Sequence, residues 1–596
     1  MIELLAGCTR LLVTAWRQGR AKTVTAIVLI LCGALAAPAT GLALRWMTDV
    51  VVAHRVRAAV LAGIVVAVLA VVALTFNHFA NISSSELSEL SELEFEQQLI
   101  DLTNGSVGMS HFEQPVFVDT LSMVRRDLPR MRQALQSMLS MVGLGLALVS
   151  TTVLLALLNP LLLLLPLLAA APLVAGYRAT QLVDAAKRDT AGQSRLALGL
   201  FALTTTAAPG KELRVFRLRD ELLRRHRGIF TDVTRRLWRA HLMAALLRAG
   251  GQLVLAVAYL GGVMLVVRDA VVGQRTVGDV VLSIMLAALV SQQVSGALAL
   301  LQELHQMSNT MRHLGDLRAM VASAQHAGGG QAAPRRLSWG IELVDVSFAY
   351  PNTDKPILRD VNLMLPAGAT VAIVGENGSG KTSLVKLLCG LYRPDTGRIL
   401  LDGADLADLA PGQWRQRLSA SFQDFVRFEL PARETVGVGD LPRIGSDEAV
   451  TGALRRARAT DVVDRLENGL DTQLGNSYAK GVDLSGGQWQ KLALGRAYMR
   501  EDPLLQVLDE PAAALDAQAE DELFGRYTEQ ARRTAGRTGA ITLLISHRFS
   551  TVRMADLIVV IADGRVADTG DHAALMRRGG LYAELYQIQA QAYTQT

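Results

Sequence analysis

Residues 375–382 read GENGSGKT and match the spacing G-x-x-x-x-G-K-[ST]. They follow an apolar segment ending at Val374 and precede a helical pattern beginning at Ser383. Glycines let such a loop curl so that backbone N–H groups point at phosphate oxygens, and the helix start adds a favourable dipole. The lysine reaches the β- and γ-phosphates, and the threonine hydroxyl is a Mg²⁺ ligand. We therefore expect a nucleoside triphosphate to be held by Gly375, Asn377, Gly378, Ser379, Gly380, Lys381, Thr382 and Ser383.

Two carboxylates follow the apolar segment 504–508. Asp509 suits the Mg²⁺ shell, directly or through water, and Glu510 can orient or deprotonate an attacking water. Alone this pair is weak evidence, but beside a phosphate-binding loop it predicts hydrolysis of the bound nucleotide. Gln506 is a polar residue inside the same segment, and the sequence offers no reason for it.

Residues 484–488 read LSGGQ and come directly before a helical pattern over 489–499. Small residues at a helix start make a second anion-binding element. With this motif, nearly the whole chain resembles the ATP-binding cassette (ABC) transporter family, which implies ATP and Mg²⁺ as cofactors. The resemblance implies that Tyr350 stacks on adenine, that Gln423 senses the γ-phosphate and binds the metal, that Asp516 lies in the D-loop, that His547 contacts the γ-phosphate, and that Ser485, Gly486, Gly487 and Gln488 contact ATP.

The resemblance also implies a dimer. In this family ATP is held between the phosphate loop of one subunit and the LSGGQ motif of the other, and this chain carries one of each. A homodimer is favoured, and a heterodimer with a related half-transporter stays open. Glu510, His547 and Ser485 are all present, so the resemblance gives no sign of a degenerate site. The main departure is Ala512-Ala513, where a Thr-Ser pair is common, and we expect the missing hydroxyl to soften communication between sites.

The composition is that of a chain with much apolar surface to bury. Half of the 596 residues are hydrophobic, 19% are charged, and mean hydropathy is +0.27, whereas soluble domains carry about a quarter charged residues. This excludes a disordered chain and a disulfide scaffold, and a wholly soluble enzyme is not expected. The net charge of +5 does not require nucleic acid as a partner, and the three cysteines show no metal-ligand spacing.

Six apolar runs predict six membrane spans, because a bilayer core of about 30 Å needs about 20 helical residues. We place the spans at about 23–44, 58–76, 134–158, 161–177, 242–267 and 277–301. They form a transmembrane domain over 1–325, followed by a Gly- and Pro-containing linker at 326–336 and an α/β cassette domain at 337–596. About 22 residues precede the first run, so we expect no N-terminal peptidase domain.

Basic residues set the orientation. They cluster before the first span and between the fourth and fifth, so both regions should be cytoplasmic in the cell (inner or plasma) membrane, together with the cassette domain. Arg45, Arg55 and Arg57 lie on the opposite side and go against this rule. The two cytoplasmic links, of around 60 residues each, predict helices that continue beyond the bilayer and meet in short turns near 111–115 and 212–225. Those turns resemble the coupling helices of a half-transporter with the type I (type IV) exporter fold.

The predicted function is ATP-driven export of an amphipathic substrate, with a modified peptide or other natural product favoured by resemblance. Lipid or multidrug export and siderophore-type import on the same fold are the alternatives. Neutral polar residues in the spans predict a substrate path, because such residues face a cavity or another helix. Successive helical residues point about 100° apart, so at least one of Gln292 and Gln293 should line a cavity. Gln252, Tyr259 and Arg248 belong to the fifth span, where Arg248 is expected to reach the cytoplasmic edge.

Overall fold

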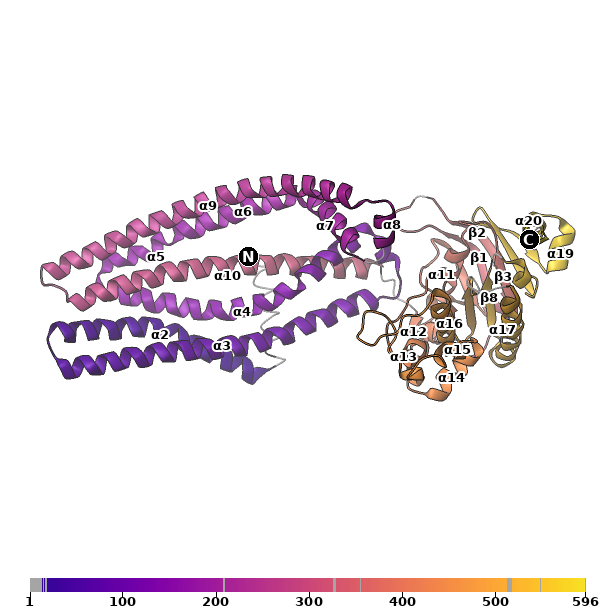
Figure 1. The fold of residues 1–596 in the computed structure, drawn as a ribbon, viewed down its shortest axis with the longest axis horizontal. Coiled ribbons are helices and arrows are strands. Elements are labelled where there is room, and N and C mark those ends of the chain that lie inside the picture. Colours follow the sequence, from indigo (N-terminus) through magenta and orange to yellow (C-terminus); the bar gives the residue numbers. More distant parts are fainter. Residues whose placement is uncertain are drawn as a thin grey trace. The chain divides into compact units, whose positions relative to one another are not determined.

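The computed structural model describes residues 19–206, 209–324, 329–353, 355–511, 517–546 and 548–594, with Val13 and Trp16 (Figure 1). The chain forms two compact units. The first contains Met1–Asp101 and Thr120–Asp316, and the second contains Leu102–Asp119 and Leu317–Thr596. A short segment between two long helices of the N-terminal half therefore belongs to the second unit.

Long helices make up the first unit. Six stretches among the described residues are long and apolar enough to cross a membrane, the number of helices that the predicted fold class requires. The helices are α2 (Arg20–Val52), α3 (Val56–Asn104), α4 (Pro115–Leu158), α5 (Leu164–Leu168), α6 (Ala170–Asp189), α7 (Ala191–Thr205), α8 (Gly210–Val215), α9 (Arg219–Val271) and α10 (Val277–Ala324). Several long helices carry exposed apolar side chains, such as Leu74, Leu157 and Val271, which suits contact with lipid tails.

The predicted fourth span is not one regular helix. It begins with the 3-10 turn η2 (Pro160–Leu163) and continues through α5 into α6. Asn159 caps the turn by accepting a hydrogen bond from the Leu161 N–H, and Pro160 stands at the first helical position, where its missing N–H costs nothing. α6 then runs beside α9 (Figure 1), and buried leucines such as Leu162, Leu255 and Leu286 fill the space between α4, α9 and α10.

Polar residues join α2 to the start of α10. Nε of Arg45 forms an ion pair with Oδ1 of Asp279 at 2.9 Å, and the Asp279 residue is 2% exposed. Oδ1 of Asp49 accepts from the Gly278 N–H at 2.8 Å, and the Thr276 hydroxyl donates to Asp49 Oδ2 at 3.1 Å. We call these five residues the polar clasp. The clasp explains why Arg45 is kept against the charge rule: its charge has a buried partner.

The second unit holds two sheets. The larger has the strand order β10 (Arg565–Gly570), β9 (Leu557–Ala562), β3 (Thr370–Val374), β8 (Ile541–Ile545), β7 (Leu505–Asp509) and β6 (Leu418–Ser421), and only β10 is antiparallel to its neighbour. The smaller, antiparallel sheet has the order β2 (Leu358–Pro366), β1 (Gly340–Phe348), β4 (Thr396–Leu401) and β5 (Ala404–Asp405).

Helices complete the second unit: α11 (Lys381–Leu388), α12 (Pro411–Gln416), α13 (Ala432–Gly437), α14 (Asp447–Arg456), α15 (Thr460–Val463), α16 (Gly486–Ala497), α17 (Ala517–Thr538), α18 (Phe549–Val552), α19 (His572–Arg578) and α20 (Leu581–Thr594). Six long helices followed by an α/β domain with a mainly parallel sheet confirm the predicted fold class. Because parallel strands end at the same sheet edge, the loop after β3 and the carboxylates at the end of β7 come together.

Gln506, unexplained in the sequence, has a buried polar environment in β7. It is 4% exposed and pairs in register with Ser419 on β6 and Thr542 on β8, and Thr542 pairs with Thr370 on β3. Its amide hydrogen-bonds the phenol of Tyr498, which immediately follows α16. A buried amide needs such partners to offset the loss of water, so Gln506 ties the central sheet to the end of this helix.

Candidate nucleotide-binding and hydrolysis site

The phosphate loop has the backbone that its glycines allow. Gly375 has φ of +152°, and a Cβ there would lie 2.2 Å from the Ile561 carbonyl oxygen. Gly380 has φ of +105° and caps α11 in the left-handed region. Side chains at these positions would collide with neighbouring strands or strain the turn, so the loop shape depends on glycine. The loop leads directly into the N-terminus of α11.

Lys381 lies across this loop. Its Nζ donates to the carbonyl oxygens of Gly375 at 2.9 Å and Glu376 at 2.8 Å. Burial lowers the pKa of Lys381, and the charges of Glu510 and Asp509 act against that shift. Ser379 is 7% exposed, and its buried hydroxyl has no hydrogen-bond partner among the described residues. A phosphate oxygen would supply that partner, so the loop fits the predicted ligand. Asn377 and Thr382 are exposed beside it.

Asp509 and Glu510 differ in environment. Asp509 is 4% exposed, and burial, followed by the charges of Glu510 and Asp424, raises its pKa to about 6 although Lys381 opposes this. Glu510 is partly exposed, and its Oε2 accepts a hydrogen bond from Gln423 Nε2 at 2.8 Å. The structure thus brings the predicted γ-phosphate sensor into contact with the predicted base.

The donor set fits Mg²⁺. This ion takes oxygen ligands and keeps sites for phosphate and water. Asp509 offers a carboxylate, Thr382 a hydroxyl and Gln423 an amide oxygen. Among the described residues no group of three His, Cys, Asp or Glu side chains could hold a metal by itself. A metal held by Asp509, Thr382 and Gln423 would complete its shell with oxygens of phosphate or water.

Tyr350 belongs to an aromatic cluster. Its ring meets Phe348 at 5.1 Å and Tyr392 at 5.4 Å between centroids, both edge-on, and the ammonium of Lys386 lies 5.3 Å from its centre. Its hydroxyl and that of Ser383 are 3.1 Å apart. Ser383, predicted to bind nucleotide, is therefore a buried partner of Tyr350.

The LSGGQ residues begin α16. Ser485 caps the helix: its hydroxyl accepts from the Gln488 N–H at 3.3 Å, and the Ser485 N–H donates to Gln488 Oε1 at 2.8 Å. This reciprocal capping uses the Gln488 side chain within its own helix. Ser485 and Gly486 are exposed, and no atom lies within 4 Å of a Cβ built on Gly486. Gly487 is partly exposed, so the start of α16 is accessible to a ligand.

Three predicted positions lie outside the described residues: His547, Asp516 and the Ala512-Ala513 pair. The sequence also missed one contact. Nε2 of Gln490 donates to the main-chain carbonyl of Glu510 at 3.0 Å. Gln490 lies on the second turn of α16, two residues beyond the LSGGQ motif, and only its polar character within a mainly buried helix could have drawn attention to it.

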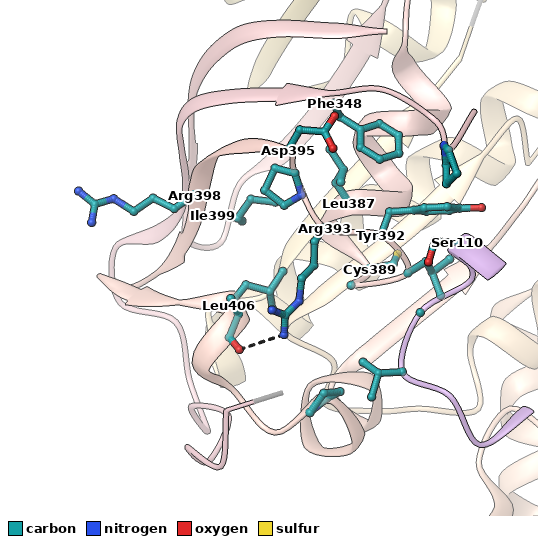
Figure 2. Close-up of a pocket in the computed structure, with 18 of the residues that line it drawn as sticks. Ser110, Phe348, Leu387, Cys389, Tyr392, Arg393, Asp395, Arg398, Ile399 and Leu406 are labelled. Atoms are coloured by element: carbon teal, nitrogen blue, oxygen red, sulfur yellow. Dashed lines mark hydrogen bonds between the residues drawn. The ribbon is translucent and has the colours of Figure 1, made fainter. Parts of the chain in front are cut away.

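The turn between α3 and α4 binds the cassette within the second unit. It contains the 3-10 helix η1 (Ser110–Glu113). The Met109 N–H donates to the Leu391 carbonyl at 3.0 Å, the Tyr392 hydroxyl donates to Glu113 Oε1 at 2.7 Å, and Arg415 donates to the Val107 carbonyl. A cavity of about 870 Å³ adjoins these contacts, with Ser110 and Tyr392 on its wall (Figure 2). Residues 212–225, the other predicted turn, lie at α8 and the start of α9.

The polar residues of the spans have separate environments. Gln293 is 8% exposed, and its Nε2 donates to the Thr151 hydroxyl of α4 at 3.0 Å, whereas Gln292 is exposed. Gln252 is also exposed, and the Tyr259 hydroxyl lies 3.5 Å from the Ile284 carbonyl. Arg248 is half-buried, and its Nε has no partner among the described residues.

Comparisons with known proteins agree with this geometry. Residues 358–513 match the family model described as ABC transporter. A solved bacterial Atm1-family ABC exporter with ATP bound has the same fold, with a TM-score of 0.80, 22% identity, and coverage of 96% of this chain and 98% of that one. The chain thus has the fold of this exporter structure, and a segment of its second unit is similar to the ABC transporter family.

Curated relatives give more detail. The nisin transport ATP-binding protein NisT of Lactococcus lactis subsp. lactis is 39% identical over 41% of this chain and 40% of its own length. The subtilin transport ATP-binding protein SpaT of Bacillus subtilis is 29% identical over 81% of this chain and 77% of its own length. The ATP-dependent lipid A-core flippase of Escherichia coli (strain K12) is 35% identical over 50% of each chain. The match thus spans half or less of the nisin transporter and this flippase.

Proposed function

We propose that the protein is an ATP-driven exporter of an amphipathic substrate that works as a dimer of half-transporters in the cell membrane, with its cassette in the cytoplasm. The observation that carries this proposal is that the turn between α3 and α4 is hydrogen-bonded to Leu391 and Tyr392 of the cassette. A helix that begins in a membrane-length apolar segment ends in a turn that is hydrogen-bonded to the ATP-binding cassette. Such a connection gives hydrolysis a mechanical route to the membrane helices.

In the proposed hydrolytic step, Lys381 and the loop N–H groups bind the phosphates of ATP. Thr382, Asp509 and Gln423 would hold Mg²⁺, which when bound neutralises phosphate charge. Glu510 orients or deprotonates the attacking water, and His547 contacts the γ-phosphate. Tyr350 contacts the adenine. The accessible Ser485 and Gly486 would meet the ATP held by a partner subunit, and a homodimer would then have two competent sites.

The dimer has a direct test. Ser485→Arg is placed in one tagged subunit and Lys381→Ala in the other, and doubly tagged dimers are isolated. Composite sites then leave one site intact and one with both lesions, whereas both substitutions in the same subunit damage both sites. Equal residual ATPase rates in the two arrangements would remove the composite-site model. Homodimer against heterodimer is settled by whether the chain expressed alone forms an active dimer.

The substrate has two candidate classes. The names of the nisin and subtilin relatives favour a modified peptide, and the flippase names favour a lipid. We favour the peptide because the subtilin relative matches the larger part of the chain. Purified protein in proteoliposomes is offered lanthionine-type peptides and, separately, lipid A-type lipids, and ATP-dependent movement of each is followed. Movement of lipid alone would reverse the preference.

A further inference from the structure

The main chain of Glu510 is held at both of its polar atoms. Its N–H donates to the Ile545 carbonyl at 2.9 Å, and its carbonyl accepts from Gln490 Nε2 at 3.0 Å. The residue has φ of +47°, which is unfavourable for a side chain with a Cβ. A strained residue keeps its conformation only where its surroundings impose it, and the Gln490 amide is one of those surroundings. The direction of the carboxylate therefore depends in part on Gln490.

Gln490 is mounted on a firmly packed helix. α16 begins at Gly486, and Gln490 lies five residues after Ser485. The adjacent Trp489 is 2% exposed. The buried side of α16, which includes Leu492 and Leu494, joins the core around α13 and α14. Five helical residues rise about 7.5 Å, so no flexible segment separates the accessible start of α16 from the Glu510 carbonyl.

We propose that Gln490 is a positioning residue that makes the carboxylate of Glu510 respond to ATP bound at the other site of the dimer. This inference rests on the proposed composite sites. In such a dimer Ser485 of a chain meets the partner's ATP, while Glu510 of the same chain acts on its own ATP. When phosphate draws the start of α16, the Gln490 amide moves with the helix and carries the Glu510 carbonyl with it.

Glu510 then has two restraints that ligands can change. Gln423 holds its carboxylate at 2.8 Å, and Gln490 holds its carbonyl. The first restraint responds to the γ-phosphate and metal of the chain's own site. The second responds to the partner's nucleotide through α16. Hydrolysis is fastest when both sites are filled, because both ends of the Glu510 residue are then in place.

The test uses doubly tagged dimers of the full chain in nanodiscs, in which one subunit carries Glu510→Gln. Turnover then comes from the other, active subunit. Gln490→Leu in the active subunit should lower turnover about 3- to 10-fold, the usual range for one hydrogen bond, with unchanged Mg-ATP binding. The same substitution in the Glu510→Gln subunit should have the smaller effect. A purely structural role in supporting α16 predicts the reverse, because the α16 that meets the active ATP belongs to the Glu510→Gln subunit.

Cooperativity is the second measurement. The wild-type homodimer should hydrolyse ATP with a Hill coefficient above 1 and at most about 2, the number of sites, and Gln490→Leu should bring it toward 1. Gln490→Glu keeps the side-chain shape but replaces the donor with an acceptor, so it should behave like Gln490→Leu and serves if that variant fails to fold. The matched control is Lys491→Gln, next along the helix, whose side chain instead pairs with Asp461 at 2.9 Å; it should keep the wild-type Hill coefficient.

Two results of the turnover measurement would overturn the inference: an equal or larger loss of turnover with Gln490→Leu in the Glu510→Gln subunit, or no loss of turnover in either arrangement. A Hill coefficient of 1 in the wild type, or the same coefficient in wild type and variant, would also overturn it. Failure of the proposed function has a different signature. Ser485→Arg in the Glu510→Gln subunit must silence the active subunit. If it does not, the composite sites are wrong, whatever Gln490 does.

Discussion

The hydroxyl of Tyr392 donates a hydrogen bond to Glu113, and the ring of Tyr392 meets Tyr350 edge-on. The first contact reaches the turn between α3 and α4, and the second reaches the residue predicted to stack on adenine. Burial, followed by the Glu113 contact, raises the pKa of Tyr392, so its hydroxyl stays protonated and remains a donor at physiological pH. One side chain thus contacts both Tyr350 and the turn that joins α3 to α4.

Tyr392→Phe tests this contact. The ring stays against Tyr350 while the hydrogen bond to Glu113 is lost, so Mg-ATP affinity should stay near wild type. Substrate stimulation of hydrolysis should fall by about 2- to 10-fold, as expected for one hydrogen bond. Glu113→Gln keeps an acceptor oxygen and should lose less than Tyr392→Phe. The measurement is the ATPase rate in proteoliposomes with and without substrate. Full stimulation in Tyr392→Phe would show that the hydrogen bond to Glu113 does not couple substrate to hydrolysis.

Glu510→Gln and Lys381→Ala should fail in different ways. A positioned base contributes about 10²–10⁴-fold to the rate, so Glu510→Gln should bind Mg-ATP and hydrolyse it slower by that factor. Lys381→Ala removes the ammonium that we propose binds the β- and γ-phosphates, so binding itself should weaken. Nucleotide binding and turnover are measured side by side. Near-wild-type turnover in Glu510→Gln would assign the base to another residue.

Asp509 predicts a pH-dependent stability in the absence of nucleotide and metal. Its pKa rises from 3.8 in the unfolded chain to about 6 in the fold. The folded state therefore binds more protons between these values, and the contribution of Asp509 to stability falls as pH rises from about 4 to about 6. Above that range the buried charge costs on the order of 3 kcal/mol. Asp509→Asn should then unfold at a higher temperature than wild type at pH 7.5.

The advantage of Asp509→Asn should shrink when the melting temperatures are compared at pH 5.5. Mg-ATP should also reverse this advantage if the Asp509 carboxylate binds the metal, as we propose. A difference that stays constant with pH would show that the Asp509 carboxyl is not the group responsible.

The polar clasp should hold α2 against α10. Asp279→Asn leaves the Arg45 charge without its partner, and we expect a loss of about 1–3 kcal/mol, the range for hydrogen bonds with charged groups. Thermal unfolding in detergent measures it. Arg55→Gln, at an exposed arginine beyond the end of α2, is the control and should leave the melting temperature unchanged. Equal melting temperatures for Asp279→Asn and wild type would mean that the ion pair adds nothing to stability.

Gln292→Leu and Gln293→Leu separate a substrate path from helix packing. Gln293 bonds Thr151 of α4, so its loss should lower stability and basal ATPase together. Gln292 is exposed in the single chain, and if it lines the path its replacement should abolish substrate stimulation while basal turnover survives. Both rates are measured in lipid. Retained stimulation in both variants would end the argument for a path along this face of α10.

Local pattern predicted much of this molecule. The six spans follow from run length, and the phosphate loop follows from the spacing of Gly375 to Thr382. What the sequence could not show are pairs of side chains far apart in the chain. Arg45 appeared to break a charge rule until α10 supplied Asp279, and Gln506 had no explanation until Tyr498 lay beside it. Gln293 pointed equally to a cavity or a neighbour, and only the position of Thr151 decides between them.

α3 runs from Val56 to Asn104 as a single helix of 49 residues, with no proline in it. Each residue inserted into a helix rotates everything beyond it by about 100°. The length of α3 is therefore constrained in whole turns rather than in residues. One added residue would present the η1 turn with the wrong face toward Leu391 and Tyr392, whereas seven, close to two full turns, would restore its orientation. Related chains should accordingly differ in α3 length by steps of three, four or seven residues, and single-residue insertions should be confined to the ends of the helix.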